Sequence, residues 1–103
     1  MFGTVARMKM KPGSMDEMRR LGQQQEERNA EGFQVMLTFQ SQKDPDEVWL
    51  VIGFKDEATY RANANDPQTS KMAGEMANLM AGPPEWHDGE IVAFRAAEGV
   101  AQH

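Results

Sequence analysis

Two neighbouring segments of the chain show the two-residue period of β-strands. In residues 33–40, the odd positions form one apolar face, made of Phe33, Val35, Leu37 and Phe39. Residues 48–54 alternate in the same way, and the polar segment 41–47, which contains Asp44-Pro45-Asp46, separates the two runs. Two alternating runs joined by a short polar loop predict an antiparallel β-hairpin.

Looser patterns mark the outer strands. Residues 2–10 alternate weakly and end at Lys11-Pro12-Gly13, as a strand ends at a turn. Near the other end, the pattern predicts the last strand at residues 90–95 and a flexible tail at residues 96–103. We therefore expect one domain at residues 1–95, followed by the tail.

The segments between the strands carry the start signals of helices. Ser14 is expected to cap the first helix, because Glu17 three residues later completes a capping box. Asp56 is expected to cap a second helix, which Asp66-Pro67 restarts with a new cap and a proline in the first turn. The restarted helix has an apolar stripe at helical spacing, formed by Met72, Met76, Leu79 and Met80.

The predicted order is strand, helix, strand, strand, helix, strand. This order is typical of an α+β, ferredoxin-like fold, in which the helices cover one face of a four-stranded antiparallel sheet. In the strand at 48–54, however, Trp49 and Val51 are apolar on the face opposite to Leu50 and Ile52. Apolar residues on both faces predict that both faces are covered. Since the chain has too few elements to cover the second face, we expect a homodimer with its sheets packed face to face.

Composition excludes several classes of function. The 103 residues include 11 basic and 16 acidic side chains, so the net charge of −5 does not favour binding to nucleic acid or an anionic membrane. There is no cysteine and there are only two histidines, which leaves no metal-binding constellation. No signal peptide or membrane-spanning run is visible, so a cytoplasmic location is expected.

Three segments resemble the antibiotic biosynthesis monooxygenase domain family. They are KPG at 11–13, FKDEATYRA at 54–62 and AGPPE at 81–85, and the resemblance extends over residues 2–95. It implies a dimeric α/β barrel, the superfamily to which this family belongs. Proteins of similar sequence include cofactor-independent quinol and polyketide oxygenases and haem-degrading enzymes.

The resemblance argues against haem degradation. The haem-degrading branch needs an asparagine, a tryptophan and a histidine at positions that hold Arg7, Asn63 and Ala73 here. Without a histidine at position 73, the usual axial haem ligand is missing. The quinol-type branch commonly has a histidine where this chain has Asn63. An asparagine can stabilise a phenolate or enolate oxygen, but it cannot act as a general base.

Asn63, Arg7 and Tyr60 are the candidate catalytic residues. Tyr60 and Asn63 are three residues apart and share one helical face, which the resemblance places beside a cavity between helices and sheet. Arg7 interrupts an otherwise apolar strand, where a guanidinium can anchor a carboxylate or phenolate. The structural alternatives are a core-edge aromatic for Tyr60 and, for Arg7, a carboxylate pair at the dimer face.

Four further residues are candidate substrate-binding residues. Met72 and Met76 offer flexible thioethers to a flat aromatic ligand, although a stripe of this spacing also suits a core. Asn65 lies at the junction of the two helical segments, where it can also serve as a turn residue. His87 is expected in a loop beside Asp88, either as part of a proton shuttle or simply solvated.

These expectations combine into one enzyme hypothesis and two alternatives. The first is a monooxygenase without a cofactor, which acts on a small aromatic phenol, quinol or polyketide whose anion reacts directly with dioxygen. The second is a non-catalytic dimeric α/β barrel that binds a small hydrophobic ligand. A third, an isomerase similar to muconolactone isomerase, rests on analogy of fold alone.

Overall fold

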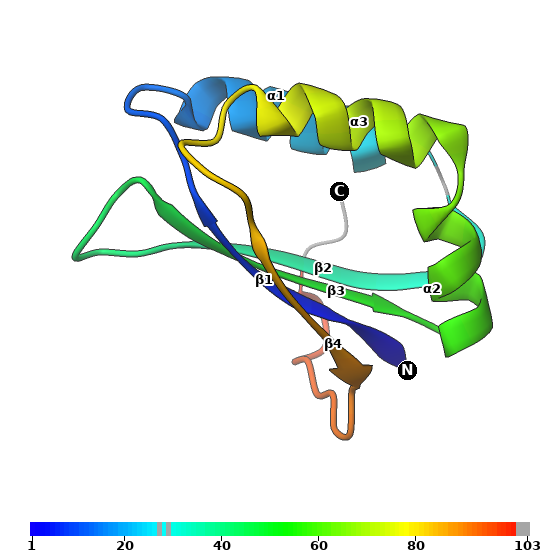
Figure 1. Cartoon of the computed structure of the whole chain (residues 1–103). Coiled ribbons are helices and arrows are strands. Elements are labelled where there is room, and N and C mark those ends of the chain that lie inside the picture. Colours follow the sequence, from blue (N-terminus) through cyan, green and yellow to red (C-terminus); the bar gives the residue numbers. More distant parts are fainter. Residues whose placement is uncertain (27, 29, 101–103) are drawn as a thin grey trace.

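Within residues 1–26, 28 and 30–100, which this computed structural model describes (side chains of 25 and 26 excepted), a four-stranded antiparallel sheet carries three helices on one face (Figure 1). The strands pair in the order β2-β3-β1-β4. They are β1 (Phe2–Lys9), β2 (Phe33–Gln40), β3 (Glu47–Phe54) and β4 (Glu85–Glu90). The helices are α1 (Met15–Glu26), α2 (Glu57–Ala64) and α3 (Pro67–Ala77). The predicted ferredoxin-like α+β fold is confirmed.

The structure differs from the sequence prediction at the end of α3 and at the last strand. Helix α3 ends at Ala77, before Leu79 and Met80, which the predicted stripe assigned to this helix. Residues 90–95 were the predicted strand, but β4 spans Glu85–Glu90 and pairs with β1 from Phe2↔Glu90 to Arg7↔Glu85. The prediction was wrong because it followed the apolar run after Glu90. An edge strand that is exposed on both faces needs backbone pairing rather than apolar alternation. Residues 101–103, the end of the predicted tail, lie outside the described residues.

The register of the sheet determines which of its residues face the helices. Thr4 pairs with both Ile52 and Asp88, and Ala6 pairs with both Leu50 and Trp86. Directly paired residues project on the same side of an antiparallel sheet. The even-numbered residues of β1, β3 and β4 therefore face the helices, and the odd-numbered ones face away.

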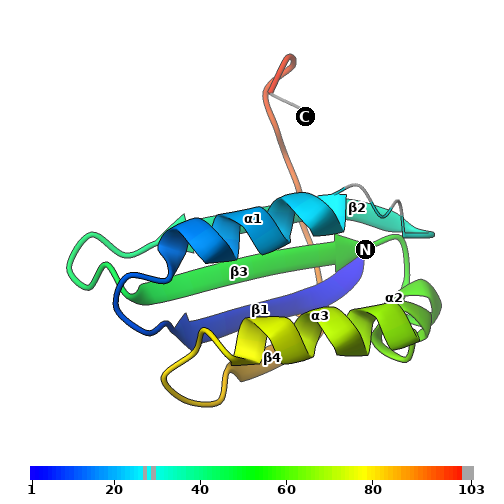
Figure 2. The ribbon, with the colours of Figure 1, turned by 90° about the horizontal axis from the view of Figure 1, so that it is seen from above.

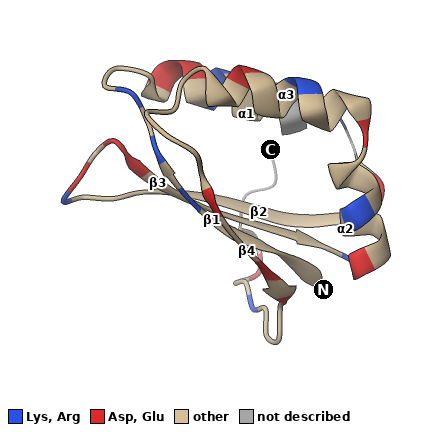
Figure 3. Cartoon of the chain, viewed as in Figure 1, with Lys and Arg blue, Asp and Glu red and all other residues tan. Residues whose placement is uncertain are grey.

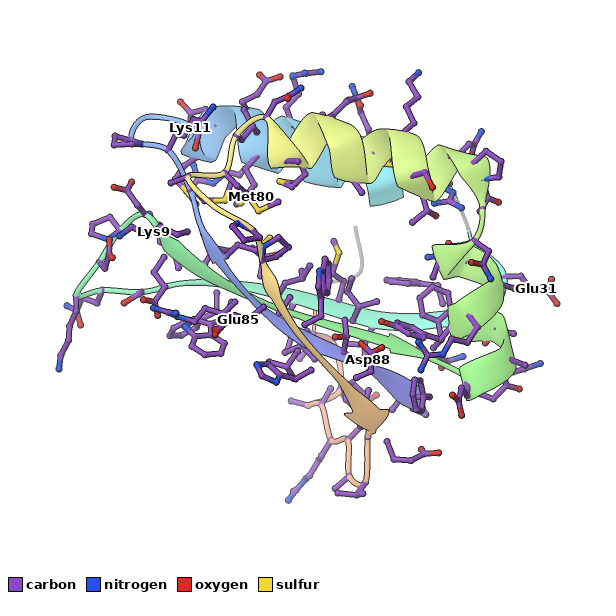
Figure 4. The ribbon with its side chains drawn as sticks, in the orientation of Figure 1. Lys9, Lys11, Glu31, Met80, Glu85 and Asp88 are labelled. Carbon is purple, nitrogen blue, oxygen red and sulfur yellow. The ribbon has the colours of Figure 1, made fainter. Side chains whose placement is uncertain are left out.

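Methionine side chains fill much of the layer between helices and sheet. The core cluster consists of Met8, Met10, Met18 and Val48, against which Met15, Leu50, Met76, Leu79 and Met80 pack. Met80 lies between the two layers in Figure 4. A backbone hydrogen bond of 2.7 Å from Lys11 N to Leu79 O ties the segment after α3 to the segment after β1. The excess of methionine in the composition is thus largely a soft core under α1 and α3.

The helix starts follow the sequence signals with one exception. Asp56 caps α2 in a reciprocal capping box with Thr59, and Asp66 caps α3 with Pro67 in the first turn. At the start of α1 the predicted capping box is replaced by other contacts. The Ser14 hydroxyl donates to the carbonyl of Lys11 (2.6 Å), and the Glu17 carboxylate is held by Arg20 one turn later.

The second face of the sheet has no helical cover from the described residues. Val5, Leu37 and Phe39 on this face are 40%, 60% and 63% exposed. After β4 the chain turns beneath this face, and the described part of the C-terminal segment extends past the β2 edge in Figure 2. Ile91 begins that segment: its N–H donates to the carbonyl of Met1 (2.8 Å).

Charged residues of both signs are interspersed over the elements (Figure 3). Among the described residues, no helix is long and apolar enough to cross a membrane.

Candidate functional site

A cluster of polar side chains joins α2 to the helix-facing side of β4. The Tyr60 hydroxyl Oη donates to Asp88 Oδ1 at 3.0 Å, and Arg61 Nη1 donates to Asp88 Oδ2 at 3.1 Å. Figure 4 shows Asp88 on the helix side of the sheet, next to α2. The two neighbouring residues of one helix thus hold both oxygens of a single carboxylate.

Aromatic packing fixes the position of the Tyr60 ring. The ring contacts Phe2 edge-to-face with a centroid distance of 5.3 Å, and it contacts Phe54 in the same way at 5.9 Å. Such pairs add to the stabilisation that comes from burial alone. Because the capping box fixes the start of α2 three residues earlier, the phenol is held over the end of the sheet with its hydroxyl on Asp88.

Thr4 places a buried hydroxyl beside this pair. It lies directly opposite Asp88 in the register and is 3% exposed. Its Oγ1 makes no hydrogen bond of normal geometry to any described residue, although it is close enough to Asp88 and Tyr60 to influence their ionisation. A buried polar atom without a partner is uncommon in a folded protein, and each instance calls for an explanation.

The cluster perturbs the ionisation of both of its acids. Burial raises the pKa of Tyr60, and the neighbouring Asp88 carboxylate raises it further. Burial also acts to raise the pKa of Asp88, but the adjacent Thr4 hydroxyl and the hydrogen bonds from Tyr60 and Arg61 outweigh burial, so that pKa lies below its ordinary value. The site therefore pairs a neutral phenol with an ionised carboxylate at neutral pH.

An exposed aromatic side chain lies on β4 near this cluster. Trp86, two residues before Asp88, is on the same helix-facing side and is 54% exposed. Its partner Ala6 is small and fully buried. Neither α2 nor α3 contains a fully buried residue, and Met72 on α3 is half-buried.

Asn63 lies one turn beyond Tyr60 on α2 and belongs to a second network. Its Oδ1 accepts a hydrogen bond from Thr69 Oγ1 at 3.4 Å, and Arg28 Nη1 donates to the same hydroxyl at 2.6 Å. Arg28 also pairs with Asp66 at 3.3 Å, and its side chain is only 12% exposed. The structure thus places a largely buried cation near Asn63. The sequence offered no signal for Arg28, which follows the predicted first helix in a polar segment.

The structure does not bring Arg7 and His87 to this site. Both have odd positions in their strands, so both project from the face opposite to the helices. Arg7 pairs there with Glu47 at 3.2 Å and Glu85 at 3.5 Å. These ion pairs are the structural alternative to a role of Arg7 in the site. His87 was expected in a loop, but it lies in β4, where it and its neighbour Asp88 point to opposite faces, so the two side chains do not form a pair.

The remaining candidates lie on the helices. Asn65 is exposed at the end of α2, where its N–H donates to the carbonyl of Arg61. Met76 packs against the core cluster, as a structural role predicts, and Met72 lies one turn earlier on α3. Sequence reasoning missed Asp88 because Asp88 was assigned to a loop. It missed Thr4 because Thr4 faces Asp88 only through the pairing of β1 with β4. Within the part of the chain that the structure describes, no group of three or more acidic or histidine side chains is placed to hold a metal ion.

The strand order, the helices on one face and the polar cluster beneath α2 define an α+β protein of the ferredoxin-like class. The chain belongs to the antibiotic biosynthesis monooxygenase family, whose model matches residues 1–74. The resemblance found in the sequence is therefore confirmed. Thr4, Tyr60 and Asn63 fall inside the matched range, whereas Asp88 lies beyond it.

Solved structures share this fold at low sequence identity. A conserved protein from Methanosarcina mazei Go1 has a TM-score of 0.76 and 17% identity, covering 85% of this chain and 89% of that chain. An antibiotic biosynthesis monooxygenase has a TM-score of 0.74 and 16% identity, covering 90% and 100% of the two chains. A protein from Mycobacterium tuberculosis has a TM-score of 0.75 and 13% identity, covering 92% and 98%. A comparison with curated proteins found no match.

Proposed function

We propose that the protein is a monooxygenase that needs no cofactor and acts on a small aromatic phenol, quinol or polyketide bound between the helices and the sheet. One observation carries the proposal. Tyr60 and Asn63 lie on successive turns of α2, Tyr60 packs on Phe2 and Phe54, and methionine side chains fill the layer between helices and sheet. Trp86 on the same face of the sheet is 54% exposed. An apolar site with a few convergent polar groups is typical of a small-molecule site. Membership of the family supports the same reaction class.

The chemistry depends on the reactivity of the substrate itself. A phenol such as 1-naphthol loses its hydroxyl proton, and the electron-rich carbon opposite the oxygen forms a C–O bond to dioxygen. Protonation of the peroxide gives a hydroperoxide. Loss of water then yields the quinone, so that one phenol and one O₂ give one quinone and one H₂O. The protein contributes binding, orientation and stabilisation of the anion.

Each residue has a separate role in this proposal. Asn63 stabilises negative charge on oxygen through its side-chain amide. Tyr60 borders the ring of the substrate and orients it. Met72 and Met76 line the opposite side with polarisable thioethers.

The test is oxygen consumption with a hydroxynaphthalene or an anthrone, in the presence of chelator and without added flavin. We expect quinone formation by the wild-type protein and a reduced kcat/KM for Asn63→Ala. Gln68→Ala, an exposed residue near the start of α3, is the matched control and should retain the wild-type rate. A rate equal to that of buffer alone would refute the proposed activity, and an unchanged rate for Asn63→Ala would refute the role of Asn63.

The second candidate is ligand binding without catalysis. It is favoured by one observation, since the Asn63 oxygen already accepts a hydrogen bond from Thr69 and the residue has no titratable group. The same assay separates the two candidates. Saturable binding of the hydroxynaphthalene without oxygen consumption would establish a binding protein.

A homodimer is proposed on the bare face of the sheet. Leu37 and Phe39 on β2 and Val5 on β1 are exposed there, and apolar residues on a sheet face favour burial against a second sheet. Light scattering is expected to give twice the mass of the chain for the wild-type protein and the mass of one chain for Leu37→Glu. Monomeric wild-type protein at micromolar concentration would contradict the dimer.

A further inference from the structure

The buried hydroxyl of Thr4 faces Asp88 and Tyr60 closely enough to influence their ionisation. Its Oγ1 is removed from solvent without a partner of normal geometry among the described residues. Leaving a buried hydroxyl unpaired destabilises a protein, and a valine would fill almost the same space without that cost. The hydroxyl is on the helix-facing side, directly across from Asp88.

The Asp88 carboxylate has capacity for a further hydrogen bond. Each carboxylate oxygen accepts about two hydrogen bonds, and here Oδ1 receives one from Tyr60 and Oδ2 one from Arg61. The Asp88 side chain is 33% exposed, so the free acceptor positions can be reached from the β4 edge. Arg61 balances its charge at 3.1 Å, which permits an uncharged ligand to approach without burying a lone carboxylate.

The neighbourhood of these two groups suits an aromatic ring. Trp86 is on the same face of β4 and is exposed over half its surface, while the rings of Tyr60 and Phe2 lie on the α2 side. A ligand that enters here meets aromatic surface together with one donor and one acceptor of hydrogen bonds. This combination recognises a hydroxyl attached to an aromatic ring.

We propose that Thr4 and Asp88 form a binding site for the hydroxyl group of a neutral aromatic alcohol, in which Asp88 accepts a hydrogen bond from the hydroxyl and Thr4 Oγ1 donates one to its oxygen. The proposal rests on the proposed oxygenase function for its chemical step, with the substrate hydroxyl at Thr4 and Asp88 and the amide of Asn63 facing the peroxide oxygen. Asp88 adds a carboxylate, which can take up a proton as an amide cannot, although its lowered pKa makes it a weak base.

The proton and electron balance of that step is simple. The O–H bond of the substrate breaks, its proton goes to an Asp88 oxygen, and the electron pair stays on the substrate. The resulting anion forms a C–O bond to dioxygen, which is reduced to a bound peroxide. Asp88, whose side chain is 33% exposed, releases the proton to water, and water protonates the terminal peroxide oxygen, which restores the carboxylate and gives the hydroperoxide. Loss of water from the hydroperoxide completes the reaction.

The experiment compares binding of 1-naphthol and its methyl ether, 1-methoxynaphthalene, under anaerobic conditions by fluorescence titration. The ether keeps the ring but has no hydroxyl proton to donate to Asp88. We expect the wild-type protein to bind the naphthol about tenfold to a hundredfold more tightly than the ether, since a site built around a hydroxyl rejects an analogue that cannot pair with it.

Two variants test the two residues separately. Asp88→Asn keeps an acceptor oxygen for Tyr60 but loses the charge, and we expect about tenfold weaker naphthol binding with little change for the ether. Thr4→Val should raise the melting temperature, because it removes an unpaired buried hydroxyl, and should nevertheless weaken naphthol binding several-fold. Higher stability with unchanged naphthol binding would show that Thr4 has only a structural role and would refute its role in binding.

Glu85→Gln is the matched control for Asp88→Asn. It alters a carboxylate of the same strand that projects from the opposite face and pairs with Arg7, so naphthol binding should not change. Equal binding of the naphthol and the ether by the wild-type protein would overturn the site.

The oxygenase and the hydroxyl site can fail independently. A clear preference for the naphthol without any oxygen consumption would leave the hydroxyl site intact and refute the oxygenase. Oxygen consumption that is unaffected in Asp88→Asn and Thr4→Val would support the oxygenase and refute the hydroxyl site.

Discussion

Gly3 on the central strand β1 is the position where an added methyl group should do the most damage. It pairs with Gly53 on β3 and Gly89 on β4, so three glycines form a row across the sheet. A Cβ built at Gly3 would lie 1.8 Å from the carbonyl oxygen of Ile52 and 2.9 Å from the Cα of Gly53. Both neighbours are backbone atoms, so neither can move without shifting β3.

The size of the effect follows from these distances. The strands would have to separate by roughly 1.5 Å for the methyl group to reach an ordinary contact distance. Overpacking costs typically about 1–3 kcal/mol, and the strained β1–β3 ladder adds about 1 kcal/mol for each backbone hydrogen bond that it loses. We therefore expect Gly3→Ala to lower the free energy of unfolding by about 3–5 kcal/mol. For a domain of this size, 3 kcal/mol corresponds to a fall in Tm of about 12–24 °C.

The assay is thermal and urea unfolding at one fixed protein concentration, because association would make the midpoint depend on concentration. Gly74→Ala is the matched control: a Cβ at this helical glycine meets nothing within 4 Å. Alanine in a helix is favoured over glycine by about 0.5–1 kcal/mol, so the control should be more stable than the wild-type protein. If Gly3→Ala unfolds at the wild-type midpoint, the β1–β3 register described above is wrong.

Two further predictions concern the core and the polar cluster. Met10 is fully buried, so Met10→Ala should lower the free energy of unfolding by about 2–5 kcal/mol. The control Gln42→Ala, at an exposed loop residue, should change it by less than about 0.5 kcal/mol. Urea denaturation measures both variants. The lowered pKa of Asp88 means that its ionised form stabilises the fold above the ordinary carboxyl pKa, and that this stabilisation is lost as the pH falls through the lowered value. The stability difference between the wild-type protein and Asp88→Asn should accordingly shrink on acidification, and a difference independent of pH would contradict that origin.

The sequence predicted those parts of the fold that depend on local pattern. The hairpin of β2 and β3 alternates strongly, and Asp56 and Asp66 have cap chemistry that works through their nearest neighbours. The β4 strand was misplaced because its polar residues are held by backbone pairing with β1, which leaves no mark on hydropathy. Arg28 escaped notice for a related reason, since its partners Thr69 and Asp66 are distant in sequence.

Only some residues of the candidate site could be predicted from the sequence. Tyr60 and Asn63 were found because a helix repeats every three to four residues, so their shared face can be read directly. Thr4 and Asp88 meet only through the pairing of β1 with β4, and a shift of one residue in that register would exchange Asp88 for His87. The carboxylate could therefore be assigned to the helix side only once the strand pairing was known.

The same register predicts that ligand binding and association are separable. Even-numbered residues of β1 and β4, such as Thr4 and Asp88, face the helices, whereas Leu37 of β2 pairs with Val51 on the bare face. Thr4→Val should therefore weaken naphthol binding without changing the mass of the particle, and Leu37→Glu should change the mass without changing the affinity of the folded protein. Substitutions that share no partners add in free energy, so the double variant should show both effects undiminished. Loss of naphthol binding in Leu37→Glu alone would mean that association shapes the ligand layer, and the separation of the two faces would then fail.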